Sequence, residues 1–99
     1  MFVYVKIYYE GSDQSVLAVC DEEILGMVLR EGDVVLDVSK DFFNGFKTHL
    51  DDLPHLLEGV NSAMLVGNNA VRKAIEAGYV HPEAVLKVGQ VPYAYLVKI

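Results

Sequence analysis

The chain is poor in cysteine and in basic side chains, and both shortages restrict what it can be. Cys20 is the only cysteine, so an internal disulfide is impossible and a reducing, cytoplasmic setting is expected. Eight lysines and arginines stand against fourteen aspartates and glutamates, which gives a formal net charge of −6. Only Arg72 and Lys73 are adjacent. The sequence therefore lacks the basic patch of most nucleic-acid-binding proteins, and nucleic acid is not expected as a direct ligand.

Long apolar runs are also missing. No run approaches the roughly 20 residues of a membrane-spanning helix. Residues 2–9 contain Lys6 where a signal peptide would be uninterrupted and apolar, so neither a membrane protein nor a secreted one is expected. The chain has no repeat and no Pro- or Gly-rich linker, and 53% of its 99 residues are hydrophobic. These features predict a single folded domain over residues 1–99.

The first half of the chain predicts three strands and one helix. The expected strands cover residues 2–9, 15–20 and 33–38, of which the first two would form a hairpin. Residues 21–31 predict a helix, because apolar residues recur there at helical spacing, with Asp21 as the N-cap and Gly32 as the stop. Residues 39–48 predict a loop or small hairpin around an Asn-Gly pair.

The second half predicts two helices followed by two strands. Residues 53–65 carry a continuous apolar stripe and predict the clearest helix, ended by Gly67. A third helix would follow, capped by Asn68 or Asn69 and ended by Gly78. The last two expected strands cover residues 85–88 and 91–99.

This order of elements predicts an α+β domain. Its sheet would be antiparallel or mixed, with four to five strands, and about three helices would pack on one face. Pro92 lacks a backbone N–H, so its end of the last strand is expected at an edge or just outside the ladder.

Cys20 is the first candidate for chemistry, because a thiol at a helix N-terminus can have a lowered pKa and act as a nucleophile. The neighbouring Asp21, Glu22 and Glu23 oppose this, because negative charge raises a thiol pKa. No base lies close in the sequence, and free cysteines are commonly buried. We therefore expect Cys20 to be a core residue, and a small enzyme or redox switch built on it is an alternative.

Metal ligands are the second candidate. His49, Asp51 and His55 lie within seven positions, with Asp52 among them, and imidazole and carboxylate groups can bind zinc or another divalent ion. Their spacing matches no recognised metal site. Because the aspartates are also good helix caps, no metal is expected, and these residues remain the candidates if one is bound.

An anion site is the third candidate. Asn68 and Asn69 open an expected helix, Arg72 and Lys73 follow, and helix N-termini bind anions through free N–H groups. The segment is neither a Walker loop nor a dinucleotide-binding fingerprint. Ordinary capping explains these residues without a ligand, so no cofactor is expected.

The tyrosines are the best functional clue. Tyr4 and Tyr8 share one face of the first strand, and Tyr93 and Tyr95 share one face of the last. Exposed on neighbouring strands, they would form a contact surface for a protein partner. A sheet buried on both faces would explain them equally well. The high apolar content favours a symmetric homodimer, with strand pairing at an open edge over residues 93–99.

Five segments, in this order along the chain, resemble a known family. They are residues 1–8 (MFVYVKIY), 19–26 (VCDEEILG), 36–38 (LDV), 61–67 (NSAMLVG) and 91–94 (VPYA). They resemble the small archaeal proteins of domain-of-unknown-function family 424. The resemblance implies a stand-alone cytoplasmic archaeal protein with no assigned reaction, cofactor or catalytic residue. It also implies a link to translation, and it would relate the acidic surplus to a salty cytoplasm.

Together these patterns favour a non-enzymatic binding or assembly domain that acts through an aromatic sheet surface, with a protein partner that could be a second copy. The alternative is a translation-associated factor that contacts a ribosomal or initiation protein.

Overall fold

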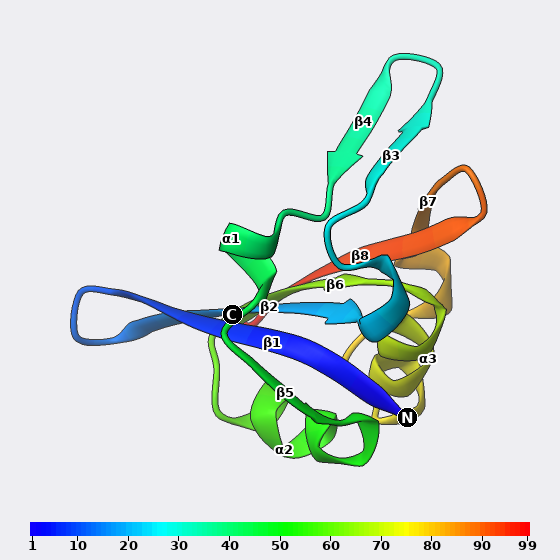
Figure 1. Cartoon of the computed structure of the whole chain (residues 1–99). Helices are drawn as coiled ribbons and strands as arrows, with labels where there is room; N and C mark the ends of the chain where they lie inside the picture. Colours follow the sequence, from blue (N-terminus) through cyan, green and yellow to red (C-terminus); the bar gives the residue numbers. More distant parts are fainter.

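A six-stranded mixed sheet lies at the centre of the molecule, and the computed structural model describes residues 1–99 (Figure 1). Its strands are β1 (Phe2–Glu10), β2 (Gln14–Asp21), β5 (Phe46–His49), β6 (Ser62–Val66), β7 (Leu86–Val88) and β8 (Val91–Val97). They lie in the order β5-β1-β2-β6-β8-β7. Neighbours are antiparallel except β2 and β6, which run parallel. The α+β class is confirmed, with more strands than the four to five expected.

The hairpin predicted for the first two strands is present, and the last two expected strands also pair as a hairpin. β1 pairs with β2 from Val3↔Asp21 to Glu10↔Gln14, and β7 pairs with β8 around the turn at Gly89. Pro92 lies one residue before the ladder between β6 and β8 begins, as expected, but β7 covers its other side.

The prediction of a helix over residues 21–31 is wrong. A single 3-10 turn, Glu22–Ile24, follows β2, and the chain then forms a second, two-stranded sheet from β3 (Val28–Glu31) and β4 (Val34–Asp37). Gly26 has a φ of 90°, which a regular helix does not accommodate, and Gly32, with a φ of 60°, forms the hairpin turn. This hairpin projects from the body of the molecule (Figure 1).

The prediction of one long helix over residues 53–65 is also wrong. Helix α2 (Leu53–Glu58) stops at Gly59, and the apolar residues after it form β6, the strand that joins β2 to β8. A strand buried on both faces is apolar at successive positions, so it reads like the continuation of an apolar helix stripe. Helix α3 (Asn68–Glu76) is present as expected.

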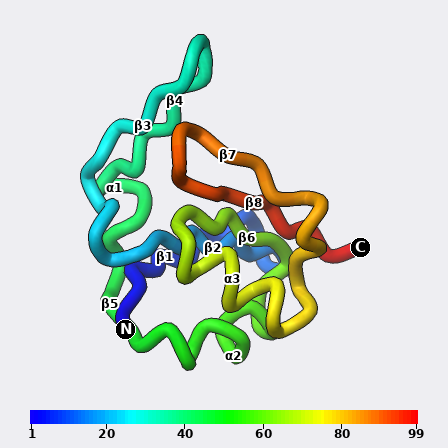
Figure 2. Tube along the Cα trace, turned by 90° about the vertical axis from the view of Figure 1, so that its right-hand side faces the viewer, coloured from blue at the N-terminus to red at the C-terminus, as the bar shows by residue number.

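The helices cover both faces of the sheet, not one. Helices α2 and α3 pack on the first face, whereas α1 (Lys40–Phe43) and the β3–β4 hairpin pack on the second (Figures 1 and 2). Helix α1, capped by Ser39, and β5 occupy the segment expected to be a loop or hairpin. None of the helices is both long enough and apolar enough to cross a membrane. The largest buried side chains of the first face are Val3, Val5, Leu17, Val19, Leu53, Leu57 and Leu65, and the second face buries Cys20, Val38, Phe43, Val66 and Val88.

Candidate functional site

Asp21 is a buried carboxylate that joins β2 to the start of α3. It is the last residue of β2, and its oxygens accept hydrogen bonds from the N–H groups of Asn69 (2.9 Å) and Ala70 (2.8 Å). Gly67 precedes the helix with a φ of 114°, and a Cβ added there would collide with the Asp21 carboxyl group. The helix start is therefore built around a carboxylate from a distant strand.

The candidate anion site at this helix start is thus occupied by the chain itself. Burial raises the pKa of the Asp21 carboxyl above its usual range, while the two N–H bonds and the charge of Arg72 act in the opposite direction. The Arg72 guanidinium donates to the side-chain oxygen of Asn69 (2.8 Å), and Lys73 forms an ion pair with Asp51 (3.2 Å). The N–H groups of Asn69 and Ala70 at this end of α3 are therefore not free to bind an external anion.

Cys20 lies beneath the second face with none of its surface exposed, so its expected burial is confirmed. Burial raises the pKa of the thiol to about 12, and the charges of Asp21 and Glu23 add to the effect. A buried, protonated thiol is a poor nucleophile, because the thiolate is the reactive form.

The candidate metal ligands lie in three different environments. The His49 ring lies 4.4 Å from the Phe2 ring, Asp51 pairs with Lys73, and His55 borders a cavity below β1. The structure brings no group of three or more histidine, cysteine or carboxylate side chains into metal-binding range.

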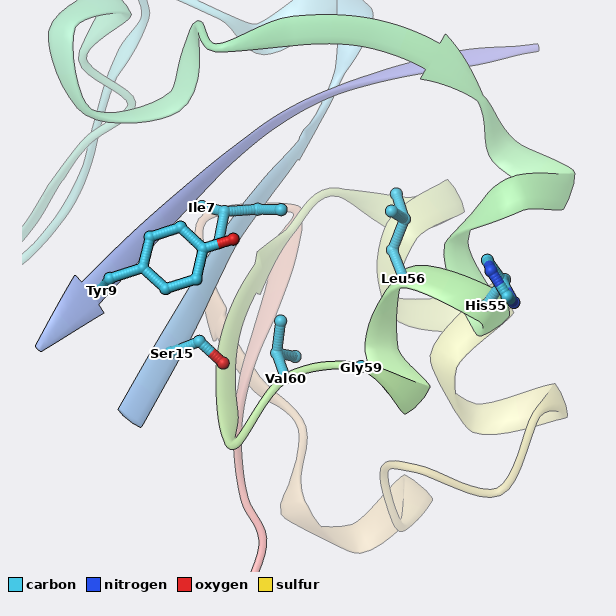
Figure 3. Close-up of a pocket in the computed structure, with 7 residues that line it drawn as sticks. All are labelled: Ile7, Tyr9, Ser15, His55, Leu56, Gly59 and Val60. Atoms are coloured by element: carbon cyan, nitrogen blue, oxygen red, sulfur yellow. The ribbon is translucent and has the colours of Figure 1, made fainter. Parts of the chain in front are cut away.

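Ser15 also lines the cavity beside His55, but the Ser15 and His55 side chains lie on opposite sides of the cavity (Figure 3). The cavity measures about 210 Å³ and is lined by Ile7, Tyr9, Ser15, His55, Leu56, Gly59 and Val60. The Ser15 hydroxyl donates to the Asn61 side chain (3.2 Å) and accepts from the Asn61 N–H (3.3 Å). This serine therefore connects the starts of β2 and β6 and has no histidine to activate it.

All four candidate tyrosines lie on the second face, but β2 and β6 separate the two pairs. The Tyr8 hydroxyl donates to the carbonyl of Phe42 (2.7 Å), and the Tyr8 and Phe42 rings stack at 5.1 Å. Tyr4, Tyr8 and Tyr93 are half-buried, whereas Tyr95 is 59% exposed. Of the tyrosine surface expected from the sequence, Tyr95 is the member most available to a partner.

Tyr95 lies on the part of the second face that α1 and the β3–β4 hairpin leave open. Helix α1 packs over β1 and β2, and the hairpin packs against β7. The register places Tyr95 opposite the half-buried Met64, and Val97 opposite Ser62. Val97 is 71% exposed. Val97 lies within the edge expected over residues 93–99, and its two-residue spacing from Tyr95 places it on the same face.

The outer edge of β8 is unpaired beside these side chains. β7 pairs with β8 only as far as Tyr93. The N–H of Lys98 donates to the carbonyl of Asn61, on the β6 side (2.9 Å). Because the direction of backbone bonding alternates along a strand, the N–H and C=O groups of Tyr95 and Val97 point the other way, toward the open edge.

A groove runs between α3 and the β7–β8 hairpin on the first face. It has a volume of about 480 Å³ and is lined by Asn68, Val71, Arg72, Ile75, Pro82, Val85, Lys87 and Pro92. Two of the candidate anion residues, Asn68 and Arg72, therefore lie at a cavity, while Asn69 and Lys73 do not line it. Lys87, which the sequence analysis did not single out, reaches the groove because it lies opposite Pro92 in the hairpin.

Comparison with known proteins agrees with the fold and the family. The structure is similar to the crystal structure of an uncharacterized conserved protein from Methanopyrus kandleri, with a TM-score of 0.80 and 24% sequence identity over 100% of this chain and 95% of that chain. At this identity the likeness concerns the fold alone. No curated protein sequence matches the chain. The family model described as "Protein of unknown function (DUF424)" matches residues 9–99. Since this match covers nearly the whole chain, the protein belongs to the DUF424 family, as the five segments predicted.

Proposed function

We propose that this protein is a non-enzymatic binding and assembly domain that acts through the open edge of β8 and the adjoining second face of the sheet. The observation that carries the proposal is the coincidence of two features at Tyr95 and Val97. Their side chains are exposed and apolar, and their backbone groups face no strand.

An edge of this kind favours pairing with another strand. A strand added beside β8 would form hydrogen bonds with the outward N–H and C=O groups of Tyr95 and Val97. Its side chains would cover the side chains of these two residues. The exposed Leu86, in the adjacent β7, would extend the apolar contact. These features support an extended strand as the partner's contacting element.

A second copy of the chain is the partner that we favour. Two β8 edges can meet antiparallel across a two-fold axis, so each copy would supply what the other lacks. Pro92 does not interfere, because its missing N–H would point toward β6 and not toward the open edge. The absence of an available nucleophile at Cys20 or Ser15 also favours assembly over catalysis.

Multi-angle light scattering at micromolar concentration tests the proposal. The wild-type protein is expected at twice its 11.0 kDa mass. Val97→Lys should give a monomer, because it would bring two like charges together at the axis. Val34→Lys is the matched control, since Val34 is an exposed strand valine on the projecting hairpin, and it should leave the mass unchanged.

A monomeric wild-type protein at every concentration would contradict self-assembly. The same edge would then have to serve a different protein, and a ribosomal or initiation protein bound by wild type but not by Val97→Lys would identify it. If Val34→Lys dissociates the dimer and Val97→Lys does not, the interface lies on the projecting hairpin.

A further inference from the structure

The groove between α3 and the β7–β8 hairpin combines an apolar lining with two cationic side chains. The apolar part consists of Val71 and Ile75 from α3, Val85 and Pro82 before β7, and Pro92 from β8. Its volume of about 480 Å³ is more than an inorganic ion fills and falls in the range of small-molecule sites.

The charges at the groove contrast with those of the rest of the molecule. The chain has a net charge of −6, yet Arg72 and Lys87 line the groove and no acidic side chain does. Neither cation forms a direct ion pair: Arg72 donates to the neutral Asn69 side chain, with its charge also acting on the Asp21 carboxyl, and the Lys87 ammonium forms no hydrogen bond. Lys47 and Lys73 are the two basic side chains that form ion pairs.

We propose that this groove binds a small organic anion, one that joins a carboxylate or phosphate group to an aromatic or branched apolar part. Arg72 and Lys87 would hold the anionic group by charge-assisted hydrogen bonds, and the Asn68 amide would donate a further one. The apolar part would lie on Val71, Ile75 and Val85. The N-terminus of α3 is not part of the site, because Asp21 occupies it.

This site is independent of the proposed assembly surface. Lys87 and Pro92 face α3 on the first side of the sheet, whereas Tyr95 and Val97 lie on the second. The two proposals can therefore fail separately.

Titration of the full-length ¹⁵N-labelled protein, followed by amide chemical shifts, tests the site. The probes are phenyl phosphate and benzoate, with inorganic phosphate and benzyl alcohol as the charge-only and apolar-only comparators. We expect saturable shifts in α3 and around Lys87, and binding of at least one aromatic anion about tenfold tighter than either comparator. Whether phenyl phosphate or benzoate binds more tightly distinguishes a phosphate from a carboxylate ligand.

Charge-removing variants locate the binding. Lys87→Gln and Arg72→Gln should each weaken binding of the tighter probe about fivefold or more. Arg30→Gln, which removes an exposed cation on β3, should change it by less than about twofold. Thermal melting of each variant confirms that it folds.

The proposal is overturned by equal binding of benzyl alcohol, by shifts centred away from the groove, or by no saturation up to about 10 mM of any probe. An equal loss of binding in Arg30→Gln would also overturn it, because the effect would then be one of overall charge.

Discussion

At the scale of single residues, Asp21 has the most consequential position. It ends one strand and caps a helix that begins more than forty residues later, with Gly67 providing the space for its carboxylate. A carboxylate at a helix start is stabilised by the helix dipole and by the two N–H donors, and these interactions offset part of the desolvation that raises the pKa of the Asp21 carboxyl. Asp21 thus fixes how α3 is oriented on the sheet.

Asp21→Ala should lower the free energy of unfolding by about 1–3 kcal/mol, because it leaves the buried N–H groups of Asn69 and Ala70 without an acceptor. Urea denaturation measures the change. Asp33→Ala is the control: Asp33 lies exposed in the β3–β4 turn, and its replacement should change stability by less than about 0.5 kcal/mol. Equal effects of the two substitutions would show that the cap contributes nothing.

Cys20 predicts a pH dependence of stability. Because the folded state raises the thiol pKa from 9.0 to about 12, folded protein holds this proton at pH values where unfolded protein has lost it. The thiol's contribution to stability is therefore complete below about pH 9 and declines as pH rises toward 12.

Comparison of wild type with Cys20→Ala isolates this contribution, since all other titrating groups are shared. The difference in unfolding free energy, wild type minus variant, should fall across that pH interval. A difference that is constant from pH 8 to about 12 would show that the thiol already ionises normally in the fold.

At the scale of elements, the sequence predicted those whose partners are local. The two hairpins and α3 follow from β-branched runs, turn residues and caps that lie within a few positions of one another. The segments 21–31 and 53–65 were assigned wrongly because their apolar spacing fits a helix as well as strands, and the neighbours that decide between them are distant in sequence. Only the fold shows that β6 lies between β2 and β8.

The same limit applies to the candidate sites. The sequence identified Asp21 as an N-cap, but for the segment beside it and not for α3. It predicted Tyr95 and an open edge over residues 93–99, and it named Arg72 as a candidate anion ligand, but it did not include the Lys87 side chain that the β7–β8 hairpin places at the same groove. Residue types can be read from a sequence. The parts of the sheet that stay uncovered depend on the positions of α1 and the β3–β4 hairpin, and these positions follow only from the fold.

Helix α2, although shorter than expected, should still contribute strongly to the core. Leu57 is fully buried among side chains of the first face, so Leu57→Ala should lower the free energy of unfolding by about 2–5 kcal/mol. Val35→Ala, at a half-exposed position on the projecting hairpin, serves as the control and should change it by less than about 0.5 kcal/mol. A small effect at Leu57 would mean that α2 is loosely held.

At the scale of the whole molecule, charge and assembly act against each other. Each chain carries −6, so two copies repel at low ionic strength even where their edges are complementary. Salt screens this repulsion, because the Debye length shortens from roughly 30 Å at 0.01 M to about 10 Å at 0.1 M.

The dissociation constant of the proposed dimer should therefore decrease as sodium chloride is raised from about 0.01 M to 0.5 M. Analytical ultracentrifugation at several salt concentrations measures it, and sodium sulfate at matched ionic strength controls for ion-specific effects. An increase of the dissociation constant with salt would indicate that ion pairs, not apolar edge contacts, hold the copies together.

The place of β6 in the sheet has a consequence for how the chain folds. The β1–β2 and β7–β8 hairpins can form as soon as their own residues are available, but β6 must insert between them, where Val16 pairs with Ser62. Such long-range pairing must close a large loop, and the entropy cost of closing it is incurred before the new contacts form. It therefore slows folding. Until β6 is in place, the inner edges of β2 and β8 are open to other chains. Aggregation during refolding is therefore a competing reaction, one that depends on protein concentration.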